Sequence, residues 1–147
     1  MRRLLHLSRG FILDALDLGP GFAFLGVLSK LGVKARRHAT IAGIGAVRVR
    51  LDDSDLMTFR QVFRDREYQF KPRAIAERIE RRYERILAAG RCPVILDAGA
   101  NIGAAALWFA ARYPRARVFA IAPDQDNRAL LVANSQGRDN TAVVAAA

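Results

Sequence analysis

The most informative segment of the sequence is Val94-Ile95-Leu96-Asp97-Ala98-Gly99-Ala100-Asn101-Ile102-Gly103. Its apolar start predicts a buried strand, and the glycines predict a tight turn that opens a helix. A glycine at position 99 lets the backbone turn and lets a ligand touch the main chain, and Gly103 lets the following helix approach the sheet closely. Asp97 stands at the carboxyl end of the strand, where ligands of open parallel sheets bind.

Strand and helix patterns alternate after this segment. Helical spacing covers residues 102–112 and 124–136, and strand patterns cover residues 117–121 and 141–145. Alternation of this kind is typical of an α/β fold with a parallel sheet. We therefore expect residues 72–147 to form part of a Rossmann-like domain. Asp124 stands directly before the second of these helices, where a carboxylate is a good N-cap.

Residues 1–71 are expected to form a separate α+β region. Helical patterns cover residues 4–16 and 22–31, and Gly19-Pro20-Gly21 separates them. Residues 34–38 are predicted to be a basic turn, and the alternation over residues 41–51 predicts one half-buried strand. A short helix is predicted over residues 55–64. A longer helix is predicted from Pro72 to Gly90, with an apolar stripe along one side.

Composition limits the classes of partner and location. The chain has 147 residues, a hydrophobic content of 52% and a net charge of +10. The charge does not gather near the glycine segment, because residues 93–147 contain five basic and four acidic side chains. No aromatic residues alternate with the arginines, so a nucleic-acid partner is disfavoured. His6 and His38 lack neighbouring ligands, so no metal site is expected.

The single cysteine, Cys92, rules out an intrachain disulfide and favours a reducing, cytoplasmic location. Cys92 is expected to be a small buried hydrophobe. Asp14 and Asp17 interrupt the first apolar stretch, which predicts mature sequence rather than a signal peptide. The uncharged run over residues 18–29 falls short of the roughly 20 residues that span a bilayer, so no transmembrane segment is expected.

The spacing of the glycine segment helps to choose between cofactors. A dinucleotide site uses Gly-x-Gly-x-x-Gly to hold a pyrophosphate, whereas this chain has Asp-x-Gly-x-Asn-x-Gly. S-adenosylmethionine has no phosphate, and Asp97 could accept a hydrogen bond from its ammonium group. Asn101 could cap the helix or contact the cofactor. The spacing thus favours a methyltransferase over a nicotinamide-dependent oxidoreductase, with candidate cofactor-binding residues Asp97, Gly99, Ala100, Asn101, Gly103 and Asp124.

Several segments together resemble the FkbM family of S-adenosylmethionine-dependent methyltransferases. They are residues 97–103, Ala105 to Ala110, Arg117 to Ile121 and Pro123-Asp124, with Ser54 to Leu56, Phe59 to Phe63 and Glu67-Tyr68 upstream. The resemblance implies a class I methyltransferase fold that transfers a methyl group to a hydroxyl of a sugar or another small molecule. It also implies that this chain is the N-terminal portion of such an enzyme, with the first three strands in the order 3-2-1.

Two departures from the family favour a second hypothesis. The resemblance implies a glutamate for the cofactor ribose where this chain has Ala122, and it implies further strands and a catalytic base beyond Ala147. The first strand, residues 94–96, is then expected at an open sheet edge. The chain could be weak or inactive alone, or a non-catalytic remnant or interaction module that pairs this edge with itself or another chain. No residue here is assigned as the catalytic base.

Overall fold

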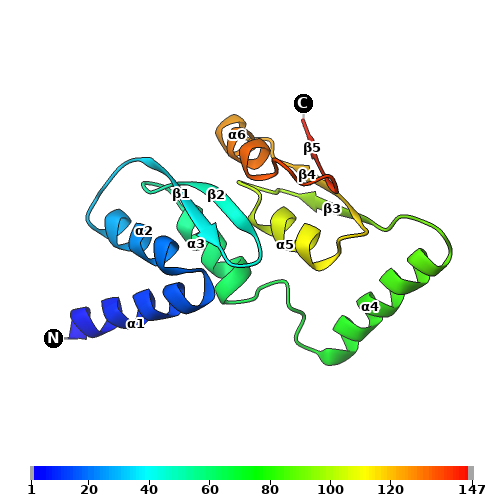
Figure 1. Cartoon of the computed structure of the whole chain (residues 1–147), viewed down its shortest axis with the longest axis horizontal. Helices are drawn as coiled ribbons and strands as arrows, with labels where there is room; N and C mark the ends of the chain where they lie inside the picture. Colours follow the sequence, from blue (N-terminus) through cyan, green and yellow to red (C-terminus); the bar gives the residue numbers. More distant parts are fainter. Residues whose placement is uncertain (1, 146–147) are drawn as a thin grey trace. The chain divides into compact units, whose positions relative to one another are not determined.

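Two compact units make up the chain, Met1–Asp65 (unit 1) and Arg66–Ala147 (unit 2). The computed structural model in Figure 1 describes the backbone of residues 2–145 and the side chains of residues 10–145. The sequence placed the division after residue 71. The structure places it before Tyr68, because this ring packs on Trp108 and Phe109 with centroids 6.0 and 5.0 Å apart.

Unit 1 contains the three helices that the sequence predicted. They are α1 (Arg2–Asp17), α2 (Pro20–Lys30) and α3 (Asp55–Phe59), and α3 continues into a π-helical turn, η1 (Arg60–Arg64). Pro20 occupies the first turn of α2, where its missing N–H removes no helical hydrogen bond. The rings of Phe22 and Phe59 are fully buried and meet edge to face at 6.2 Å. Aromatic burial therefore joins α2 to α3 in the core of this unit.

The half-buried strand predicted over residues 41–51 is confirmed for residues 45–50, where Val47 and Val49 are buried, but its predicted start is wrong. The turn predicted over residues 34–38 is also wrong. The structure has an antiparallel hairpin of β1 (Arg36–Ile41) and β2 (Gly45–Arg50). Gly43 and Gly45 have φ angles of 74° and 100° at the connection, a left-handed conformation that side chains rarely adopt. The prediction failed because these glycines make a tight turn inside what was taken as one continuous strand.

Two buried carboxylates of unit 1 are fully paired. Asp55 accepts the Arg50 backbone N–H at 2.7 Å and the Arg50 guanidinium at 2.7 and 3.0 Å. Asp14 accepts Arg60 Nε at 2.9 Å and Arg64 Nη1 at 2.9 Å. Because a buried charge without a partner is strongly destabilising, these pairs fix β2 against α3 and α1 against η1.

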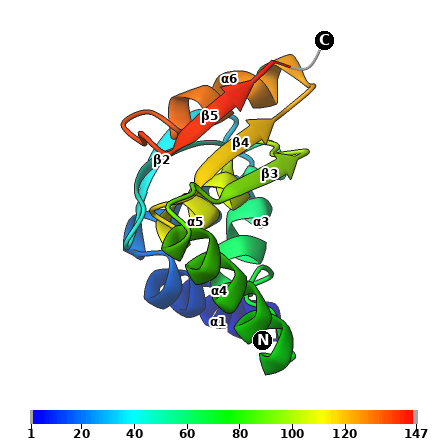
Figure 2. The same cartoon turned by 90° about the vertical axis from the view of Figure 1, so that its right-hand side faces the viewer.

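Unit 2 is an α/β unit with a three-stranded parallel sheet. Its elements are α4 (Arg73–Ala88), β3 (Val94–Ala98), α5 (Ala104–Arg112), β4 (Arg117–Ile121), α6 (Gln125–Asn134) and β5 (Thr141–Val144). Figure 2 shows the strands side by side, with β4 in the middle. The alternation of strands and helices and the strand order 3-2-1 are confirmed. The unit is compatible with a Rossmann-like fold.

The two faces of this sheet are covered unequally. One face packs against α5 and α6 in a core that includes Ile95, Ala106, Ala110, Val118, Ala120 and Leu131. Successive strand residues point to opposite faces, so Val94 and Leu96 point away from this core, and each is 65% exposed. In the part of the chain that the structure describes, β3 pairs only with β4. The predicted edge position of the first strand is therefore confirmed.

The expected burial of Cys92 is wrong. Cys92 is exposed and lies just before β3. Its Sγ is 3.5 and 3.7 Å from the carbonyl oxygens of Pro93 and Arg115.

Among residues 2–145, no helix is both long enough and apolar enough to cross a bilayer.

Candidate functional site

The chain reverses sharply at the carboxyl end of β3. Gly99, Asn101 and Gly103 all have positive φ angles, of 97°, 49° and 96°. The N–H groups of Gly99 and Ala100 donate to the Ile121 carbonyl at 3.0 and 2.8 Å, which anchors the start of the turn to β4. This turn (residues 99–103) is therefore a fixed backbone feature, held from one side by the neighbouring strand.

The two glycines of the turn have different surroundings. A Cβ at Gly103 would lie 2.8 Å from Leu131 Cδ1, whereas a Cβ at Gly99 would meet nothing within 4 Å. Gly103 thus permits the close approach of α6. The sequence predicted instead that Gly103 lets the helix that follows it approach the sheet. Gly99 is exposed and faces open space. Of these two glycines, only Gly99 has open space through which a ligand could approach the backbone, although its N–H is already bonded to Ile121.

Asp97 carries an unsatisfied oxygen next to this turn. A hydrogen bond from the Ala106 backbone N–H, in the first turn of α5, tends to lower its pKa, but burial raises it more, and the net pKa is raised. Its Oδ2 is buried and has no hydrogen-bond partner within the described residues. Leaving a buried polar atom unpaired costs about 1–3 kcal/mol, more for a charged group. A donor supplied by a ligand would remove that cost.

The structure changes the roles predicted for Asn101 and Ala100. Gly103, not Asn101, is the N-cap residue of α5, so the capping role predicted for Asn101 is wrong. Asn101 instead adopts a left-handed conformation, which asparagine tolerates better than most residues. The Ala100 side chain is buried in the core, and its N–H is engaged by β4. Its backbone amide is therefore not available to a ligand.

Asp124 and Ala122 lie after β4, the neighbouring strand. Asp124 Oδ1 accepts the Asn127 N–H at 2.8 Å, so the predicted N-cap of α6 is confirmed. Ala122 is buried in the hydrophobic core. A glutamate at this position would have to leave that core to reach a ligand. Asp97 is near the end of β3 and Asp124 follows the adjacent parallel strand β4, so both lie at the carboxyl edge of the sheet.

Tyr68 is a neighbour of Asp97 that the sequence did not assign to the site. Burial raises the pKa of the Tyr68 hydroxyl most, and the negative charges of Asp97 and then Glu67 raise it further. A tyrosine with a raised pKa stays protonated at neutral pH and can act as a donor. Sequence spacing gave no signal, because 29 positions separate the two residues; only the ring packing of Tyr68 on α5 brings it near.

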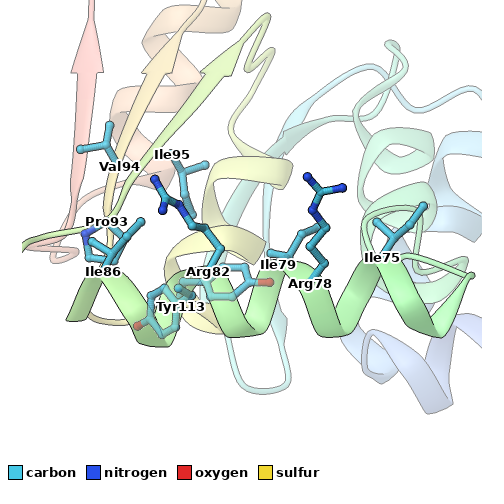
Figure 3. A pocket seen from close by; sticks show the side chains of 10 residues that line it. Ile75, Arg78, Ile79, Arg82, Ile86, Pro93, Val94, Ile95 and Tyr113 are labelled. Carbon is cyan, nitrogen blue, oxygen red and sulfur yellow. The ribbon is translucent and has the colours of Figure 1, made fainter. Parts of the chain in front are cut away.

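An apolar groove of about 540 Å³ lies elsewhere in unit 2, along α4 (Figure 3). It is lined by Ile75, Ile79 and Ile86 of α4, with Val94 and Ile95 at the amino end of β3. The predicted helix and its apolar stripe are confirmed, although none of its residues is buried. Glu80 ties α4 to α5 by accepting Arg112 Nη2 at 2.5 Å. The groove is separate from the turn, which follows the opposite end of β3.

Comparisons with family models, with curated proteins and with solved structures found no match. Within residues 2–145, no group of three or more His, Cys, Asp or Glu side chains is placed to hold a metal ion.

Replacing each glycine by alanine tests the different roles of Gly99 and Gly103. Gly103→Ala should lower the free energy of unfolding by about 2–4 kcal/mol, because overpacking against Leu131 adds to backbone strain. Gly99→Ala should lower the free energy of unfolding by only about 1 kcal/mol, because it adds backbone strain without overpacking. Urea unfolding followed by the fluorescence of Trp108, the single tryptophan, reports on unit 2. Equal losses for the two variants would contradict this assignment.

A second variant tests the burial of the Asp97 carboxylate. Since the pKa of Asp97 is raised in the folded state, its contribution to stability should be complete below the ordinary carboxylate pKa and should be lost as pH rises through the raised value. Asp97→Asn keeps an oxygen to accept the Ala106 N–H but removes the charge, so this contribution to the slope should disappear. Urea unfolding between about pH 4 and 8 measures the effect. The exposed Asp139→Asn serves as control, and an unchanged slope in Asp97→Asn would refute the prediction.

Proposed function

We propose that the carboxyl end of the sheet in unit 2 binds S-adenosylmethionine and that the chain is a methyltransferase of the FkbM type. The proposal rests mainly on one observation: the unpartnered Oδ2 of Asp97 beside an open backbone turn. Ligands of parallel α/β sheets bind at this end of the strands. The sequence resemblance supplies the family, the class I fold and the acceptor class, a hydroxyl of a sugar or another small molecule.

The residues present fit the amino-acid part of this cofactor. Its ammonium group could donate to the buried Oδ2, and the bare backbone at Gly99 leaves room for close approach. A dinucleotide fits less well, because the Asp97 carboxylate already takes the Ala106 N–H at the start of α5. A negative charge at that position would repel a pyrophosphate, which needs helix amides. This disfavours a nicotinamide-dependent oxidoreductase.

The residues of this chain contribute binding and orientation to the reaction. When bound, S-adenosylmethionine would supply a sulfonium methyl group that passes to the acceptor oxygen, with S-adenosylhomocysteine as the leaving group. Asp97 would hold the amino-acid end of the cofactor, and the main chain at Gly99 would position it. The entropy cost of aligning the reacting groups would then be met on binding rather than in the reaction itself. Tyr68 remains protonated and suits a donor rather than a base. The proton acceptor for the hydroxyl is not assigned to any residue described.

We expect the cofactor to bind weakly. Ala122 provides no contact to the ribose hydroxyls, and Asp124 Oδ1 is occupied by its cap hydrogen bond. A lost hydrogen bond to a charged acceptor lowers affinity about ten- to hundredfold. Detection therefore calls for concentrated protein.

Calorimetric titration with S-adenosylhomocysteine tests the proposal. The parent chain should bind, and Asp97→Asn should bind about ten- to hundredfold more weakly because the charge-assisted hydrogen bond is lost. The exposed Asp126→Asn in α6 serves as a matched control and should bind as the parent does. A folded parent that shows no heat of binding, or an Asp97→Asn variant with parental affinity, would refute the proposal.

The uncovered sheet face supports a second candidate function, that of an interaction module. Val94 and Leu96 expose apolar surface on an edge strand, and the groove along α4 begins at the amino end of the same strand (Figure 3). Edge strands with exposed apolar side chains readily pair with other chains. Self-pairing through β3 would cover this surface without any cofactor.

Size-exclusion chromatography with light scattering tests this second candidate. The parent should self-associate as concentration rises, and Leu96→Lys should shift it to a monomer, because a charge on an edge strand blocks pairing. Val132→Lys, an exposed apolar position on α6, is the control and should behave as the parent does. A parent that stays monomeric at every concentration and melts cooperatively would exclude the interaction module.

A further inference from the structure

Helices α1 and α2 expose large apolar side chains in unit 1. Ile12 and Leu16 lie one turn apart on α1, and Leu16 is 78% exposed. On α2, Phe24 is 56% exposed, and Leu31 at the C-cap, on the same side of the helix, is 74% exposed. Exposed apolar side chains that recur on neighbouring turns of a helix mark an interaction site more often than scattered single residues do.

The segment that contains these helices has a positive net charge. Residues 1–40 contain seven basic and two acidic side chains. One of the two acids, Asp14, is buried and paired with Arg60 and Arg64, so it adds little negative charge to the surface. Exposed basic residues follow the apolar stripe of α2 at Lys30, Lys34, Arg36 and Arg37. The surface therefore combines apolar side chains with a cationic border.

A hollow of about 620 Å³ joins the two helices on this surface. Phe11, Ile12 and Val27 line it, together with Met57 of α3 and Lys30. Arg60 also lines it and is held by Asp14. Gly26 is required for this arrangement, since a Cβ there would lie 2.6 Å from Arg60 Nη2. Apolar residues of α1, α2 and α3 thus line one hollow together with the cationic side chains of Lys30 and Arg60.

We infer that α1 and α2 dock unit 1 on an anionic membrane surface. Apolar side chains can enter the headgroup boundary while neighbouring lysines and arginines meet lipid phosphates. A second copy of the chain fits this surface poorly, because two cationic borders would repel each other. The exposed side chains also form stripes along two helices, which is typical of helices that lie in a membrane interface. This inference is independent of the methyltransferase proposal.

Co-sedimentation of the full chain with lipid vesicles tests the inference. The parent should bind vesicles of equimolar phosphatidylcholine and phosphatidylglycerol more tightly than pure phosphatidylcholine vesicles, and added salt should weaken binding. The double variant Leu16→Glu/Phe24→Glu should bind about tenfold more weakly or worse, from lost apolar insertion. Lys30→Glu/Lys34→Glu leaves the apolar residues in place and should also lower binding to the anionic vesicles.

Val132→Glu is the matched control, because Val132 is also an exposed apolar residue but lies on α6 of unit 2. It should bind vesicles as the parent does, and circular dichroism should show that every variant keeps its helices. The inference is overturned if the parent does not bind anionic vesicles or binds both vesicle types equally. It is also overturned if Val132→Glu loses as much binding as the double variant, or if the parent binds polyglutamate but not vesicles.

Discussion

The close contact between Gly103 and Leu131 constrains the whole of unit 2. A Cβ at Gly103 would lie 2.8 Å from Leu131 Cδ1, so the bare backbone there lets α6 pack closely at the start of α5, and Gly103 itself has a left-handed conformation. The same turn is tied to β4 through the Ile121 carbonyl. These contacts with α6 and β4 hold the backbone at the carboxyl end of β3, and that backbone is what a ligand would meet.

Three buried or half-buried carboxylates of this chain differ in their partners. Asp14 and Asp55 are each satisfied by arginine, as expected of structural charges. Asp97 keeps one buried oxygen without a partner among the described residues, and burial raises its pKa. An unpaired group at the mouth of a parallel sheet destabilises the empty protein and favours binding of a donor. The contrast makes Asp97 the candidate site residue under the proposed function.

Much of the fold could be predicted from sequence, because its signals are local. Apolar runs, glycines and the Asp124 cap identified the strands and helices of unit 2 and their order. The hairpin around Gly43 was missed because continuous alternation hid a tight turn, and the capping role of Asn101 failed because the helix begins two residues later. The proximity of Tyr68 to Asp97 depends on aromatic packing across the unit, which no local pattern encodes.

Amide chemical-shift mapping by NMR during titration with S-adenosylhomocysteine tests most directly whether the turn after β3 faces a ligand. We expect the largest changes in chemical shift at the amides of Gly99, Asn101 and the first turn of α5. The amides of residues in the α4 groove, such as Ile79, should not shift. Shifts confined to that groove, or no shifts at all in a folded sample, would contradict this expectation.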